Sequence, residues 1–408
     1  MMNLVCAYGI DSSAVKLVVG YEYEKEVIVL FSGKKDLAQN VILNDKVNDS
    51  DAICMAIKDL LLEAENSLKM DITSVTLVLP ANGLEVFENV ASTSVVSTST
   101  KIADVDIRNV INMLLRDNYS EDNEVVDIIP ITYSLDKDRV FSNPPLGEES
   151  TTLTLKAFVH TVPRYIKNVY MSLIEKVGLK VNNLVVAPYG IGQLFLTYKD
   201  VPNKYFLVNL GANNTSVVSM SNGKPYRVCF VNYGSDSITK VLANRLGISY
   251  EKAEELKRTY GLEKTTHTYL PNVVKSELSE DIKFTAKEIA VIISDELERL
   301  MKDIIRALKT MSSESPELEQ WPVVFVGGGR NIIGFKDFVK EKIQMRKCIL
   351  PSIKSIGARN MIYIDELGAI KIVSNVTFKE DKHEEGSHHV LTREKEVKTK
   401  YSETKDSL

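Results

Sequence analysis

Three turns in this chain follow strand-like apolar runs and carry glycines or polar side chains that could bind a ligand. The first turn has Asp11, Ser13 and Lys16, the second has Asn209, Gly211 and Asn213, and the third has Gly327, Gly328 and Gly329. Glycine allows a sharp turn and a close approach of backbone N–H groups to a phosphate, while a carboxylate can hold hydrated magnesium. The three turns together predict one nucleotide held between two lobes.

A single turn of this kind is a weak signal, because a strand followed by a glycine turn is ordinary in α/β proteins. Asp11 could simply cap the turn at the end of its strand. Lys16 lies within an apolar run, and its simplest interpretation is a sheet-edge residue with its amine in solvent. Glu254 and Lys257 are three residues apart on a predicted helix, which fits a surface ion pair as well as a nucleoside contact.

The composition limits the functions open to the chain. With 408 residues and 44% hydrophobic content, it can bury a large core and suits two domains or one two-lobed body. The formal net charge of -5, without a basic stripe, argues against a nucleic-acid partner.

No basic leader with a cleavage site and no bilayer-spanning apolar stretch is present, so we expect a cytoplasmic protein. The four dispersed cysteines predict reduced thiols.

Strands and helices alternate in the first lobe, which we place at residues 1–81 and 160–203. The expected elements are strands over 5–10, 15–21, 27–31, 75–79 and 183–186, a helix over 53–68 capped by Ser50 or Asp51, a helix from Thr161 to Gly178, and a turn over 188–192. The β-branched and Ser/Thr-rich segments over 82–159, around one amphipathic helix at 106–115, predict a small inserted α+β module.

The second lobe is expected over residues 204–378. It contains a short helix between the Ser249 cap and Gly261, and a long helix that begins at a capping box formed by Thr285 and Glu288. Charged and polar residues dominate 379–408, which predicts a disordered tail.

This order of segments resembles the actin-like ATPase fold, and within that fold the FtsA family of bacterial cell division proteins. The resemblance covers about residues 4–378. Its most specific part is the inserted module, which contains Val126-Asp-Ile-Ile-Pro130 and Asn143-Pro-Pro-Leu-Gly147, because FtsA has a subdomain (1C) there and actin has nothing equivalent. The resemblance implies a two-lobed α/β fold with a cleft for ATP or ADP and Mg²⁺. It also implies self-association into protofilaments and a location at the division site near the cytoplasmic membrane.

The resemblance assigns roles to the residues of the three turns. Asp11 takes the position of the magnesium carboxylate, and Lys16 that of a phosphate ligand. The family pattern Asp-x-Gly-Thr is Asp11-Ser-Ser13-Ala here, and Asn209 replaces an aspartate in the second turn, where Gly211 alone survives of a glycine triplet. We therefore expect slow or absent hydrolysis, and a gain in affinity or turnover when Asn209→Asp and Ser13→Gly restore the pattern.

The third turn matches the family pattern in full. Its glycines would pass beneath the adenine and ribose, while Glu254 and Lys257 would flank the nucleoside. Asn213, in the second turn, belongs to the same predicted set of nucleotide contacts.

A partner surface is also implied by the resemblance. FtsA proteins bind the C-terminal peptide of FtsZ along the long helix of the second lobe, which here carries Lys287, Glu296 and Arg299. Glu296 stands where the family commonly has arginine, so we expect binding through the helix's apolar stripe and a partner tail with basic residues. Alternatively, Glu296 and Glu298 form only a solvated face. The tail has too few apolar residues for an amphipathic anchor, which predicts indirect membrane attachment.

Two other functions share this fold. A scaffold similar to PilM, the pilus platform protein, would have a similar helix over 249–261 but would not explain the module over 82–159. A sugar or acetate kinase is the weakest alternative, because the sequence offers no carboxylate for activating a substrate hydroxyl.

Overall fold

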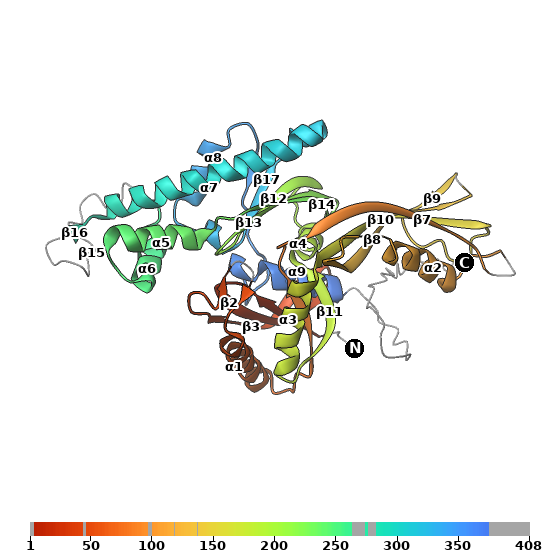
Figure 1. Cartoon of the computed structure of the whole chain (residues 1–408), viewed down its shortest axis with the longest axis horizontal. Coiled ribbons are helices and arrows are strands. Elements are labelled where there is room, and N and C mark those ends of the chain that lie inside the picture. Colours follow the sequence, from red (N-terminus) through yellow and green to blue (C-terminus); the bar gives the residue numbers. More distant parts are fainter. Residues whose placement is uncertain are drawn as a thin grey trace, which may run out of the picture.

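The computed structural model describes residues 4–374 except 44–45, 97–99, 118, 137, 263–273 and 276–282. Two five-stranded sheets form the centres of its two halves, and a four-stranded sheet projects from them at the right of Figure 1. The helices are α1 (Ser50–Leu68), α2 (Asp104–Leu115), α3 (Arg164–Lys176), α4 (Ala187–Phe195), α5 (Ser235–Leu246), α6 (Tyr250–Tyr260), α7 (Ala286–Glu314), α8 (Phe335–Lys342) and α9 (Ile364–Val373), with 3-10 turns η1 (Pro316–Leu318), η2 (Gly328–Asn331) and η3 (Met361–Tyr363).

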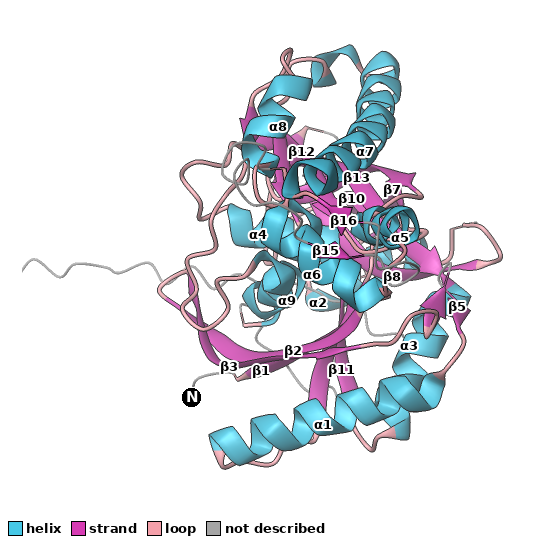
Figure 2. Ribbon diagram, turned by 90° about the vertical axis from the view of Figure 1, so that its left-hand side faces the viewer, coloured by secondary structure: helices cyan, strands magenta, loops and turns pink. Residues whose placement is uncertain are grey.

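The first sheet has the strand order β11-β6-β1-β2-β3. Its strands are β1 (Val5–Ile10), β2 (Ala14–Tyr23), β3 (Glu26–Asp36), β6 (Ser74–Leu79) and β11 (Lys180–Val186). β1, β2 and β3 form an antiparallel meander, while β6 pairs parallel with both β1 and β11. Both faces are buried because alternate side chains of β1 and β2 enter two different cores. Helices α1 and α3 belong to one core, α4 and α9 to the other, and Figure 2 shows α1 beneath this sheet.

The projecting sheet is antiparallel, with the strand order β7-β10-β8-β9. Its strands are β7 (Glu85–Ser94), β8 (Asn123–Leu135), β9 (Arg139–Phe141) and β10 (Thr152–Pro163). Helix α2 buries Val110 and Leu114 against this sheet and forms a separate small core with it. These four strands and one helix fall within residues 82–163.

The second large sheet has the order β14-β13-β12-β17-β18. Its strands are β12 (Lys204–Leu210), β13 (Thr215–Ser221), β14 (Lys224–Val231), β17 (Val323–Val326) and β18 (Cys348–Ile349); the short pairs β4 (Ile42–Leu43) with β5 (Lys46–Val47) and β15 (Val274–Lys275) with β16 (Lys283–Phe284) lie apart from it. Helices α5, α6, α7 and α8 cover one face and build their own core with it.

Helices α4 and α9 join the two halves. Their apolar side chains share one core with residues from both large sheets, so the helix pair lies between the sheets. The two backbones touch where they cross, because a Cβ added to Gly190 would lie 2.9 Å from the carbonyl carbon of Gly368. Only glycine at both positions permits this approach.

Several predicted boundaries are wrong. Asp49, rather than Ser50 or Asp51, caps α1 by accepting hydrogen bonds from the N–H groups of Asp51 and Ala52. Thr161 lies inside β10, which extends to Pro163, so α3 begins at Arg164. Residues 188–192 are helical within α4 because Pro188 occupies its first turn, where proline is favoured. The predicted disordered tail, 379–408, lies outside the described residues.

Candidate functional site

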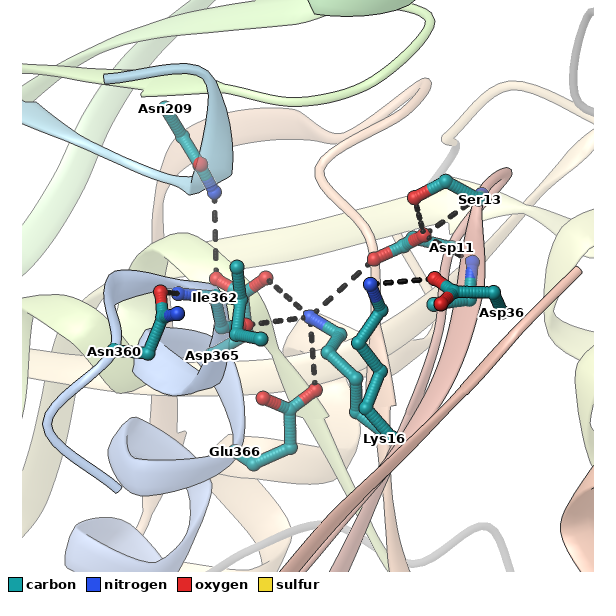
Figure 3. Close-up of polar contacts among 11 residues, drawn as sticks. Asp11, Ser13, Lys16, Asp36, Asn209, Asn360, Ile362, Asp365 and Glu366 are labelled. Carbon is teal, nitrogen blue, oxygen red and sulfur yellow. Dashed lines mark hydrogen bonds and ion pairs between the residues drawn. The ribbon is translucent and has the colours of Figure 1, made fainter. Parts of the chain in front are cut away.

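The first and second turns meet the start of α9 between the two large sheets (Figure 3). The ammonium of Lys16, at the start of β2, donates a 2.9 Å hydrogen bond to the carbonyl of Ile362 in η3. From the other half, the side-chain amide of Asn209 donates to Asp365 Oδ1 at 3.3 Å. The predicted convergence of the first two turns is therefore present, but α9 also contributes to the site.

Asp11 organises the first turn. Its Oδ1 accepts hydrogen bonds of 2.8 Å from Ser13 N–H, Ser13 O–H and Ala14 N–H. Its Oδ2 lies 3.4 Å from Lys16 Nζ. Burial opposes ionisation, but Lys16 and these hydrogen bonds outweigh it and hold the pKa of Asp11 below its ordinary value. The turn-capping interpretation of Asp11 is correct for one oxygen, while the other faces the ammonium of Lys16.

Lys16 is buried, so the prediction of a solvent-exposed amine is wrong. Only 5% of the residue is accessible, and its Nζ lies 3.4 Å from Asp11, 3.2 Å from Glu366 and 3.8 Å from Asp365. Burial alone would lower the pKa of Lys16, but the three carboxylates, Glu366 foremost, raise it above the ordinary value. The side chain is held charged inside the protein.

Asp365 and Glu366 occupy the first turn of α9, where the helix dipole favours negative charge. Glu366 is fully buried, and burial raises its pKa to about 7 although Lys16 opposes the shift. Burial likewise raises the pKa of Asp365. A methyl group at Gly9 of β1 would collide with Glu366 Oε1, so glycine there leaves the space that this carboxyl group fills.

The charges of this cluster are unbalanced. Three carboxylates surround one ammonium, and Asn209 adds a neutral donor to Asp365. An aspartate at 209 would instead face Asp365 with a like charge, which accounts for the amide at this position. Within the part of the chain that the structure describes, no three His, Cys, Asp or Glu side chains are arranged to hold a metal ion.

The second turn and the third turn pack against each other. Gly327 has a φ of 85°, and a Cβ on it would collide with the side chain of Asn209. Gly211 pairs with Asn214 through its N–H and accepts from Ser235 N–H at 3.0 Å. Asn213 reaches the first half, where its amide lies 3.5 Å from the carbonyl of Ile42.

Glu254 and Lys257 form an ion pair of 2.6 Å beside the third turn, but it is not a surface pair. Lys257 is 3% exposed and donates to Ser235 O and Thr239 Oγ1, while Gly329 faces the Ser235 side chain. Burial lowers the pKa of Lys257, and Glu254 only partly offsets that effect. These contacts tie α6 to α5 next to Gly329.

A hollow of about 490 Å³ opens next to the third turn. Its lining consists of Arg330, Asn331, Ser352, Ile353, Arg359, Asn360 and Met361. It adjoins the ion cluster through Ile362, whose N–H donates to Asn360 Oδ1 at 3.2 Å and whose carbonyl accepts from Lys16.

The predicted partner residues lie on α7 and have different environments. Lys287 and Arg299 are exposed, and the Arg299 guanidinium lies over the ring of Tyr233, 5.4 Å from its centroid. Glu296 is 7% exposed and accepts a short hydrogen bond from the Tyr233 hydroxyl. Both interpretations of Glu296, as a group facing a partner and as a solvated residue, are therefore wrong.

The side chains of the apolar stripe of α7 are also buried in the core. Its members, Ile289, Ile292, Ile293, Leu297 and Leu300, are all buried. Val291, 42% exposed, is the large apolar side chain that the described part of α7 presents to solvent. No helix among the described residues is long and apolar enough to cross a lipid bilayer.

Solved structures with similar backbones have the actin-like fold. A chain of the PilM–PilN type IV pilus biogenesis complex superposes with a TM-score of 0.59 at 17% identity, covering 90% of this chain and 96% of that one. MreB 5 of Spiroplasma citri bound to AMPPNP gives a TM-score of 0.50 at 11% identity, covering 90% and 95%. At these identities the likeness establishes the fold alone, and it confirms the predicted fold class.

Sequence comparison narrows the relationship. The family model "Cell division protein FtsA" matches residues 206–367. A cell division protein FtsA of Streptococcus pneumoniae serotype 2 (strain D39) is 25% identical over 378 residues, 90% of this chain and 79% of the relative. The chain is an FtsA-like protein with the actin fold. The predicted resemblance to FtsA is confirmed, and it covers 90% of this chain.

Asp365 and Glu366 are the site residues that sequence reasoning missed in this FtsA-like protein. A usable signal was present, because two adjacent acids interrupt an otherwise apolar segment over 361–370. Charged residues in such a segment require a buried partner of opposite charge. Lys16, itself inside an apolar strand, is that partner.

Proposed function

We propose that this FtsA-like protein acts in cell division as an actin-fold adaptor, which binds the C-terminal tail of FtsZ and helps to organise the division ring. The similarity to FtsA over 90% of the chain is the observation that supports this proposal most strongly. Self-association into actin-like protofilaments belongs to the same proposal. We expect the protein in the cytoplasm at the division site, attached to the membrane indirectly.

The docking surface that we propose is the exposed face of α7. Lys287 and Arg299 offer positive charge there, and Val291 offers a small apolar contact. Since Glu296 is hydrogen-bonded inside the protein, we now expect the two exposed cations to attract acidic groups of the FtsZ tail, rather than a glutamate to attract basic groups.

The test is a titration of the full chain with an FtsZ C-terminal peptide. Lys287→Glu combined with Arg299→Glu should weaken binding roughly five- to tenfold and reduce its salt dependence. Lys302→Glu, an exposed charge reversal farther along α7, is the matched control and should have little effect. If the wild-type chain does not bind the peptide, the adaptor proposal is wrong.

We further propose that the cleft binds ATP or ADP weakly, with the nucleoside near the hollow at the third turn and the phosphates toward Lys16. Support comes from the buried ammonium of Lys16 and from the Asp11 carboxylate beside it, whose side chain is 42% exposed and could hold hydrated magnesium. When bound, the nucleotide would supply phosphates that bridge the two halves. Hydrolysis should be slow because Asn209 offers no carboxylate to orient water.

The fold similarity to the PilM–PilN complex favours one second candidate, a pilus-type scaffold. A pull-down from the native cell distinguishes the two candidates. Recovery of FtsZ supports the division adaptor, whereas recovery of a pilus assembly protein without FtsZ supports the scaffold.

A further inference from the structure

We propose that Asp365 and Glu366 determine ligand specificity in the cleft by competing with nucleotide phosphates for Lys16. This inference rests on the proposed nucleotide site. Its consequence is discrimination by phosphate charge: the cleft favours adenosine or a ligand with few phosphates over ATP.

The geometry places both carboxyl groups where an anionic ligand of Lys16 would lie. Glu366 Oε1 lies 3.2 Å from Lys16 Nζ, and Asp365 Oδ2 lies 3.8 Å from it. Asp11 and the carbonyl of Ile362 occupy further directions around the same ammonium. A phosphate can reach this ammonium only by replacing at least one of these oxygens.

Electrostatics strengthens the competition. With all three carboxyl groups ionised, Lys16 leaves an excess of two negative charges in the described cluster. A phosphate chain adds negative charge beside Lys16 and Glu366, whose side chains are buried, so screening between them is weak. Each added phosphate should therefore weaken binding instead of strengthening it.

Within the described structure, the carboxyl group of Glu366 also depends on Lys16 for its polar contacts. Neither Oε1 nor Oε2 makes a hydrogen bond of good geometry, so the ion pair is the interaction that holds this side chain. Burial raises the pKa of Glu366 to about 7, which reflects how poorly the site accommodates its charge. Neutralising it removes a competitor for Lys16 while Asp11 and Asp365 keep the ammonium paired.

The experiment compares adenosine, ADP and ATP, each with Mg²⁺, by calorimetric titration of the full chain above pH 7. Glu366→Gln and the double variant Glu366→Gln with Asp365→Asn should raise ATP affinity by about tenfold or more, with adenosine affinity unchanged. Glu22→Gln is the control. Glu22 pairs at 2.6 Å with Lys371, which is a buried residue of α9 like Glu366 but lies outside the cluster. Its ATP affinity should match the wild type.

The outcomes separate the two proposals. If adenosine and ATP bind the wild type and the Glu366 variants alike, competition is wrong and the nucleotide site stands. If no variant binds any of the three ligands while circular dichroism shows all of them folded, both the nucleotide site and the competition are wrong. Equal gains for adenosine and ATP would also overturn the inference, because they would indicate a general opening of the cleft.

Discussion

Replacement of Glu366 by glutamine should make the protein more stable at neutral and alkaline pH. Glutamine has nearly the size of a protonated glutamic acid and has no charge to bury. Lys16 keeps Asp11 at 3.4 Å and Asp365 at 3.8 Å, so the substitution does not leave the buried ammonium unpaired. The variant therefore removes a poorly accommodated charge at little structural cost.

The magnitude follows from the pKa of Glu366, about 7 in the folded protein against 4.5 ordinarily. Between these values the folded protein keeps a proton that the unfolded chain has lost, so wild-type stability falls as pH rises through this window. Below 4.5 both states are protonated and the effect is absent. Above pH 7 the fall in wild-type stability is complete and amounts to roughly 3 kcal/mol. The glutamine variant would not show this fall.

The assay is urea denaturation of wild type and Glu366→Gln at a series of pH values from below 4.5 to above 7. The difference in unfolding free energy should start near zero and grow across the window in favour of the variant. Glu22→Gln should instead lower the free energy of unfolding, because it removes the charge that pairs with Lys371. A Glu366→Gln variant that is less stable than wild type above pH 7 would refute the reasoning, since it would mean that ionised Glu366 stabilises the fold.

Three other substitutions test the surrounding contacts. Asn209→Asp should lower stability by about 1–2 kcal/mol through repulsion of Asp365, and adding Asp365→Asn should recover most of the loss in a double-mutant cycle; additive effects would count against this contact. Tyr233→Phe should cost about 1–3 kcal/mol in unfolding free energy by leaving the buried Glu296 carboxylate without its donor, and an unchanged denaturation midpoint would show that water replaces the hydroxyl. Gly368→Val should lower the melting temperature by at least several degrees, because the side chain would enter the α4 backbone; a melting temperature equal to that of wild type would contradict the close crossing.

Much of the fold could be predicted because the apolar periodicity is strong. The six residues of β1, the Ser249 cap of α6 and the capping box of α7 were all evident in the sequence. Residues 188–192 were mistaken for a turn because two glycines usually break a helix. Here those glycines serve tertiary packing, a requirement that no local pattern reveals.

The site was predictable only in part. Turn composition identified Asp11 and Asn209, and their proximity to the start of α9 depends on how two distant halves pack. The environment of Lys16 was misjudged because edge exposure and burial with a partner look alike in sequence. Glu296 was misjudged for the same reason, since its partner Tyr233 lies 63 residues away.

The glycine crossing of α4 and α9 constrains how this protein can evolve. Each backbone fills the space beside the other. A larger residue at Gly190 or Gly368 could not be compensated by a smaller residue at the opposite position, because glycine is already the smallest residue. Substitution is therefore blocked at both positions, whichever of the two glycines changes first. We expect lineages that retain this helix pair to keep small residues at both sites even where the cleft residues diverge. The pair would then mark shared ancestry of the fold independently of whether a descendant still uses a nucleotide.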